Sequence, residues 1–165
     1  MAGSFDDLLA ANARYAADFQ LAGFDGIAHA GVAVVTCMDS RIDPLGMLDL
    51  RPGDAKMLRN PGGRVTDQAL AALVLAVNLL GVERVLVVPH TRCAMATGTE
   101  AGLAELVGRA SGKDASWQTF GAIDDQEVAL RYDVDRVRGH PLISESIAVG
   151  GFLYDVDTGR LTQLV

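Results

Sequence analysis

Apolar residues along this chain fall into two patterns: short runs, and stripes spaced like one face of a helix. The runs do not alternate with polar residues, which is typical of strands buried on both faces of a parallel sheet. They predict four strands, at residues 32–37, 55–59, 84–90 and 147–155. Asp157-Thr-Gly159 then predicts a hairpin turn, which leads into an antiparallel strand at residues 161–164.

Helical spacing fills most of the intervals between these strands. Helices are expected at residues 67–80, where Thr66 is the N-cap, at 101–110 and at 124–138, with a short one at 44–49. For the start of the last long helix we expect a capping box of Asp124 and Glu127.

The opening residues, 1–22, are predicted to form another helix, with Ser4 and Asp7 resembling a capping box. Its apolar side chains form one stripe, which contains Phe5, Leu8, Leu9, Ala16 and Phe19. This stripe must be buried either on the core of this chain or on a second subunit.

Strands alternate with helices over most of the length. The predicted fold class is therefore α/β, a mostly parallel sheet flanked by helices with an antiparallel strand at the C-terminus. The sequence shows no internal repeat, low-complexity tract or linker, and 165 residues suit one hydrophobic core. We expect a single domain over residues 1–165.

The charge balance narrows the range of partners. Fourteen basic and 21 acidic residues give a net charge of −7, which weighs against nucleic acid or an anionic membrane as a partner. The longest apolar run, residues 69–80, is interrupted by Asn78 and is shorter than the roughly 20 residues of a membrane span. No basic segment followed by an apolar stretch opens the chain, so we expect a cytoplasmic protein.

Residues with metal-binding chemistry stand at the ends of two predicted strands. Cys37 ends the first strand, His90 ends the third, and Cys93 follows three residues later. Ligands gather beyond the carboxyl ends of parallel strands, so these three side chains are expected to meet at one edge of the sheet. Two sulfurs and one nitrogen suit Zn²⁺ and leave one position open, as in catalytic zinc sites.

Asp39 and Arg41 follow Cys37 at intervals of two residues, so in an extended segment all three face the same site. Asp39 would either coordinate the metal or pair with Arg41. Other interpretations remain open at this point: a closed structural zinc site, a redox pair of cysteines, or cysteines that merely pack as small apolar residues.

Three segments together resemble the β-class carbonic anhydrases, and in particular their short bacterial members. They are Cys37-Met-Asp39-Ser-Arg41, then Arg59-Asn60-Pro61-Gly62, then His90-Thr-Arg-Cys93. The resemblance extends from the N-terminal helix to the closing strand and hairpin.

This resemblance implies a fold and a site. Cys37, His90 and Cys93 would be the zinc ligands, and Asp39 and Arg41 the catalytic dyad, with Asp39 as a fourth zinc ligand in a closed state. The core strand order would be 2-1-3-4. The assembly would be a homodimer or a dimer of dimers, with the helix of residues 1–22 packed on the partner subunit.

The implied activity is the reversible hydration of carbon dioxide to bicarbonate. Two alternatives remain: hydrolysis of carbonyl sulfide or carbon disulfide at the same site, and a non-catalytic zinc-binding or redox-sensing protein. Three positions depart from the usual family pattern: Pro61 replaces Ala, Arg92 replaces Asp and Ala94 replaces Gly. Ala94 would be strained if the backbone there had a positive φ, and Arg92 places a cation beside the ligands.

Overall fold

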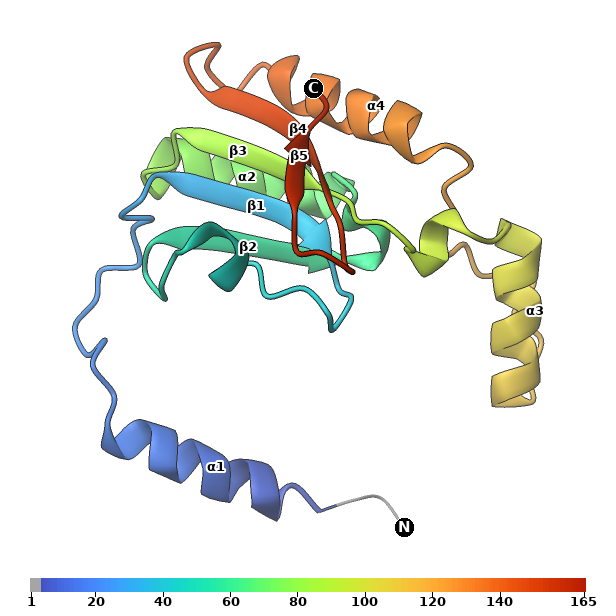
Figure 1. Ribbon diagram of the computed structural model, residues 1–165, viewed down its shortest axis with the longest axis horizontal. Helices are drawn as coiled ribbons and strands as arrows, with labels where there is room; N and C mark the ends of the chain where they lie inside the picture. The colour runs from blue at the N-terminus through green and yellow to red at the C-terminus, as the bar shows by residue number, and fades with distance from the viewer. Residues whose placement is uncertain (1–3) are drawn as a thin grey trace.

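The computed structural model describes residues 4–165 and contains one five-stranded sheet (Figure 1). Its strands are β1 (Val32–Cys37), β2 (Ala55–Asn60), β3 (Arg84–Val88), β4 (Ala148–Tyr154) and β5 (Leu161–Gln163). They lie in the order β2-β1-β3-β4-β5. The first four are parallel to their neighbours and β5 is antiparallel to β4, which confirms the predicted fold class and the core order 2-1-3-4.

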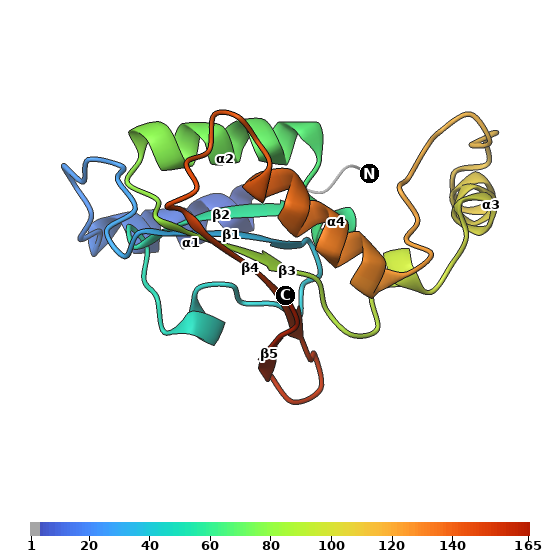
Figure 2. The same ribbon diagram turned by 90° about the horizontal axis from the view of Figure 1, so that it is seen from above.

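Two helices cover one face of the sheet, α2 (Asp67–Leu79) and α4 (Gln126–Arg138) (Figure 2). The buried core between them and the sheet includes Ala33 and Val35 of β1 and Leu73 of α2. On the opposite face, Val32 and Val34 pack in a second apolar cluster that includes residues of the segment 42–50 and of β5. All six residues of β1 are buried, because this central strand is covered on both faces.

Two further helices lie to the side of this core. Helix α1 (Asp6–Ala17) lies apart from the sheet, and none of its side chains is buried. Helix α3 (Glu100–Ser111) lies beyond the carboxyl ends of the parallel strands (Figure 1). Residues 1–3 of the predicted first helix lie outside the described residues.

The two predicted capping boxes are wrong, although both helices exist. Phe5 is the N-cap of α1 and makes no side-chain cap; the Ser4 hydroxyl accepts instead from the backbone N–H of Asp6. In α4 the N-cap is Asp125, not Asp124, and its carboxylate accepts from the N–H groups of Glu127 and Val128. Asp124 and Asp125 both suit the N-cap position by residue type, and the path of the preceding loop decides which of them occupies it.

Other differences from the expected elements are small. The predicted helix at residues 44–49 is a single 3₁₀ turn, Gly46–Leu48, and β3 ends at Val88, two residues before His90. Thr66 caps α2 as expected, and its hydroxyl accepts from Ala69 N–H. Among residues 4–165, no helix combines the length and apolar character that a membrane crossing requires.

Candidate metal centre

Three residues with metal-ligating atoms meet at the carboxyl edge of the sheet. One ligand atom each of Cys37, His90 and Cys93 lies within 4.8 Å of the others, and all three residues are buried. Both cysteines are free thiols. The structure thus brings together the three residues that the sequence pattern placed at one sheet edge.

The sheet itself sets these positions. Cys37 is the last residue of β1 and lies opposite Asn60 of β2. The buried hydroxyl of Thr36 donates to the carbonyl of Val88 at 2.7 Å, which ties the end of β1 to the end of β3. His90 continues the line of β3 as an isolated bridge to Tyr154. Cys37 and His90 therefore stand at hydrogen-bonded strand ends, and Cys93 follows in the loop that leads into the 3₁₀ turn Ala94–Ala96.

The imidazole of His90 is prepared to bind a metal. Its Nδ1 lies 2.9 Å from the carbonyl oxygen of Thr91, a partner that requires a proton on Nδ1. Its Nε2 is buried and has no hydrogen-bond partner among the described residues. Burial also lowers the pKa of His90, which favours the neutral ring. A buried lone pair aimed at two sulfurs is the arrangement that a metal would satisfy.

The two thiols complete a donor set that suits zinc. Burial raises the pKa of the Cys93 thiol, and the neighbouring Cys37 adds to the effect. A second thiolate is therefore unfavourable here without a cation, and metal binding would release protons. Two sulfurs and one imidazole nitrogen fit Zn²⁺ rather than Mg²⁺ or Ca²⁺, which prefer oxygen.

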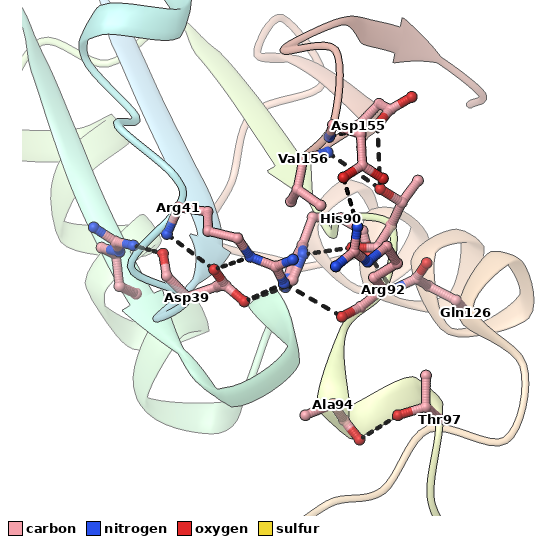
Figure 3. A network of polar contacts seen from close by, with 12 residues as sticks. Asp39, Arg41, His90, Arg92, Ala94, Thr97, Gln126, Asp155 and Val156 are labelled. Atoms are coloured by element: carbon pink, nitrogen blue, oxygen red, sulfur yellow. Dashed lines mark hydrogen bonds and ion pairs between the residues drawn. The ribbon is translucent and has the colours of Figure 1, made fainter.

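Asp39 and Arg41 form a paired side-chain unit close to His90 (Figure 3). Arg41 Nε donates to Asp39 Oδ1 at 2.9 Å and Arg41 Nη2 donates to Oδ2 at 2.8 Å. The backbone N–H of Arg41 also donates to Oδ1. These bonds from Arg41 hold the pKa of Asp39 well below its usual range, so the carboxylate is ionised. Asp39 Oδ2 lies 3.8 Å from His90 Nε2.

A second arginine fixes the backbone of this segment. Arg59 Nε donates to the carbonyl of Cys37 at 3.0 Å, and Arg59 Nη2 donates to the carbonyl of Asp39 at 2.6 Å. The side chain of Arg59, which comes from β2, therefore fixes the backbone of Cys37 relative to that of Asp39.

Two more contacts support the ligands from behind. Gln126 Nε2, at the start of α4, donates to the carbonyl of His90 at 3.1 Å. Gly63 has φ +67°, and a Cβ at this position would lie 3.0 Å from the backbone nitrogen of Cys37. Only glycine combines that backbone conformation with such a close approach.

The site opens into a cleft of about 590 Å³. Its polar lining comes from the ligand residues, Asp39, Ser40 and Arg41, and its apolar lining comes from Met38, Pro61, Ala94 and Met95. A small apolar molecule can therefore rest against these side chains next to the carboxylate.

Ala94 does not have the positive φ that would strain it; this backbone conformation occurs at other residues. Among the described non-glycine residues, only Asp49 and Arg92 have positive φ, with Arg92 at 56°. Ala94 begins a 3₁₀ turn and needs no glycine. The guanidinium of Arg92 pairs with Asp157 through Nη1 and Oδ1 at 2.5 Å, so its charge is offset by a carboxylate.

Sequence reasoning did not assign roles to Arg59, Gln126 or Asp157. Arg59 opens one of the three segments that carry the family resemblance, and this was the only signal for it in the sequence. Gln126 and Asp157 lie 36 and 65 residues from their partners, and no local spacing reports such pairs.

The model of the family described as carbonic anhydrase matches residues 32–161 of this chain. Beta-carbonic anhydrase 1 of Mycobacterium tuberculosis is 31% identical over 162 residues, covering 96% of each chain. Carbon disulfide hydrolase of Acidianus sp. is 35% identical over 154 residues, covering 79% of this chain and 75% of the relative. The crystal structure of carbonic anhydrase from Streptococcus mutans superposes with a TM-score of 0.87 at 38% identity, covering both chains fully.

Proposed function

The chain belongs to the β-class carbonic anhydrase family, and we propose that it catalyses the zinc-dependent interconversion of carbon dioxide and bicarbonate. One observation carries this proposal: the buried Cys37, His90 and Cys93 share an open cleft with an ionised carboxylate that an arginine holds in place.

The residues present fit the metal that the family uses. Zinc would be held by the Sγ atoms of Cys37 and Cys93 and by Nε2 of His90, which is buried and has no hydrogen-bond partner within residues 4–165. When bound, zinc lowers the pKa of a water molecule and supplies hydroxide under mild conditions. Three protein ligands would leave the metal with a position for that water.

Asp39 then orients the attacking water. Its carboxylate accepts the hydrogen bond of the water, and it remains ionised because Arg41 donates three hydrogen bonds to it. Arg59 fixes the backbone on both sides of this carboxylate. Orientation by a preorganised acceptor is a contribution that needs no rearrangement during the reaction.

We also propose that Asp39 is the fourth metal ligand in a closed state. Its Oδ2 is 3.8 Å from His90 Nε2, close enough to reach the ligand group once Arg41 releases the carboxylate. In this structure both carboxylate oxygens of Asp39 accept hydrogen bonds from Arg41, and a carboxylate held in this way would leave the metal open to water.

The cleft suits the two forms of the substrate. Carbon dioxide is linear and apolar, and Met38, Pro61, Ala94 and Met95 line the cleft with apolar surface. Bicarbonate is an anion, and the half-exposed guanidinium of Arg41 supplies positive charge at the same place.

Hydrolysis of carbon disulfide or carbonyl sulfide is the second candidate. These molecules are also linear and apolar, and the likeness to the Acidianus carbon disulfide hydrolase favours testing them. Parallel turnover assays on one zinc-verified preparation separate the three substrates. Carbon dioxide should give the highest kcat/KM, and a higher value for carbon disulfide would replace our first candidate by the second.

A stopped-flow hydration assay tests the proposal directly, with metal-stripped protein as the blank. Asp39→Asn should keep its zinc but lose roughly 10²- to 10⁴-fold in kcat, the range of a positioned acid–base group. A protein with one zinc per chain and no hydration activity would instead be a non-catalytic zinc protein. Formation of a Cys37–Cys93 disulfide on mild oxidation would favour the redox-sensing alternative.

We propose that the working unit is a homodimer, or a dimer of dimers, in which α1 packs on the partner subunit. Five of the larger apolar side chains of residues 5–19 are exposed: Phe5, Leu8, Leu9, Tyr15 and Phe19. An exposed apolar surface of this kind on a soluble chain marks an interaction site. We further propose a cytoplasmic location, because two free metal-ligating thiols suit a reducing compartment.

A further inference from the structure

Arg92 has an unusual backbone for its residue type and its position. It stands between His90 and Cys93 and has φ 56°, in the left-handed region that glycine, asparagine and aspartate occupy more readily than arginine. The conformation matters because the chain turns at this residue, between two side chains that face the same cleft.

Contacts hold Arg92 at both of its ends. Its carbonyl oxygen accepts a long hydrogen bond from Arg41 Nη2 at 3.4 Å, and its Nη1 donates to Asp157 Oδ1 at 2.5 Å. The first of these contacts is drawn in Figure 3. Arg92 therefore connects the ligand-bearing loop, the Asp39–Arg41 pair and the turn between β4 and β5.

The start of that turn is hydrogen-bonded to the ligand-bearing loop. Thr91 N–H donates to the carbonyl of Tyr154 at 2.9 Å, and the Thr91 hydroxyl accepts from Val156 N–H at 3.1 Å. Within the turn, Asp155 Oδ1 accepts from the N–H of Asp157 at 2.8 Å. The backbone that carries Asp157 is thus tied to the residue between His90 and Arg92.

We propose that Asp157 is a positioning residue, which acts through Arg92 to hold the ligand-bearing loop and the Asp39–Arg41 pair in register. The inference rests on the proposed function and names a residue that acts on the same site. An aspartate in place of Arg92 would face Asp157 with like charge, so the pair depends on the arginine at this position.

The pair contributes to geometry rather than to global stability. The side chains of Arg92 and Asp157 are 64% and 58% exposed, and exposed ion pairs contribute little to unfolding free energy. A matched control exists on α4, where Arg131 and Glu127 pair at 2.7 Å with exposures of 54% and 58%. Loss of either pair should leave Tm nearly unchanged, so a change in the site reports positioning.

The test is a double-mutant cycle on zinc-loaded protein with Asp157→Asn, Arg92→Gly and the double variant. Glycine is chosen because it keeps the left-handed backbone while removing the side chain. Each single variant should lower kcat by roughly 3- to 10-fold with little change in KM, the effect of a sub-ångström misplacement. The double variant should lose no more than either single variant. Glu127→Gln should match the wild type.

A second measurement does not depend on turnover. Proton exchange with water at Arg41 Nε–H, followed by NMR and assigned by its absence in Arg41→Lys, should be several-fold faster in Asp157→Asn than in Glu127→Gln. Additive losses of kcat in the cycle, or an unchanged exchange rate, would overturn the inference. If the wild type lacked hydration activity while the exchange rate still responded to Asp157→Asn, the proposed function would fail and the positioning role would stand.

Discussion

Helix α1 and the carboxyl edge of the sheet differ in how much of their surroundings this chain provides. Every residue of β1 is buried, Cys37, His90 and Cys93 are buried as well, and Gly63 packs closely against the backbone of Cys37. None of the described side chains of α1 is buried, although its apolar residues form a stripe along one face.

The metal site and helix α1 therefore differ in what each needs for its structure: the same chain in one case, a second subunit of the proposed assembly in the other. All three metal ligands come from one chain, Cys37 and His90 from strand ends and Cys93 from the loop after them, so the site should bind its ion with the geometry of that chain alone. Helix α1 has no buried side chain among the described residues, so in the proposed assembly its contribution would depend on the partner subunit. Each prediction below perturbs one of these regions.

The largest effect should follow from changing the ligands. Cys37→Ser, His90→Ala and Cys93→Ser should each lose the single zinc expected per chain and, with it, detectable hydration activity. Elemental analysis after gel filtration measures the metal directly, and circular dichroism checks that the strands persist, because a coupled site can destabilise its fold. Purified wild-type protein without zinc would contradict the assignment of the metal centre.

Removal of residues 1–22 tests the other region. The truncation should turn a stable dimer into aggregated or inactive protein, because the partner surface that α1 covers would become exposed. Light scattering on a size-exclusion column measures the mass, and zinc content measures the site separately. A monodisperse and fully active monomer would show that α1 serves neither assembly nor catalysis.

A single methyl group should separate packing at the site from backbone strain. Gly63→Ala places a Cβ 3.0 Å from Cys37 N and 3.2 Å from Val88 O at φ +67°, whereas Gly112→Ala meets nothing within 4 Å at φ +69°. Both variants lose about 1 kcal/mol to left-handed strain, and Gly63→Ala should lose about 1–3 kcal/mol more from overpacking. Denaturant unfolding measures both, and zinc affinity should fall only for Gly63→Ala. Equal losses would show that the strand ends can yield.

The sequence predicts the strands and the grouping of the ligands, but not the long-range contacts that support the site. The strand at residues 32–37 could be placed to the residue, since a buried parallel strand leaves an unbroken apolar run. The ligands could be grouped because strand ends converge. The support of the site could not be predicted: Arg59 and Gln126 donate to backbone carbonyls 20 to 36 residues away. Such contacts depend on the tertiary path of the chain, and no spacing along the sequence reports them.

The smallest effect should appear in the pH–rate profile, where the departure at position 92 is tested. Two thiolate ligands offset the charge of Zn²⁺, so a Cys₂His set acidifies water less than three histidines do, for which the pKa is about 7. Hydration activity should therefore be low near neutrality, and the midpoint of its rise should lie roughly one pH unit or more above the value for three histidines. Competition by Asp39 for the fourth position would move this midpoint further up.

Arg92→Asp should move the midpoint higher still, because it replaces a cation by an anion and leaves Asp157 without its partner. That shift should be only about a few tenths of a unit, and should shrink as salt is added, because residue 92 is exposed and screened. The midpoint of the Arg92→Asp profile is independent of its plateau rate, and the loss of positioning should lower only the plateau rate. A wild-type profile already flat by about pH 7 would exclude competition by Asp39, and an Arg92→Asp midpoint below that of the wild type would contradict the electrostatic argument.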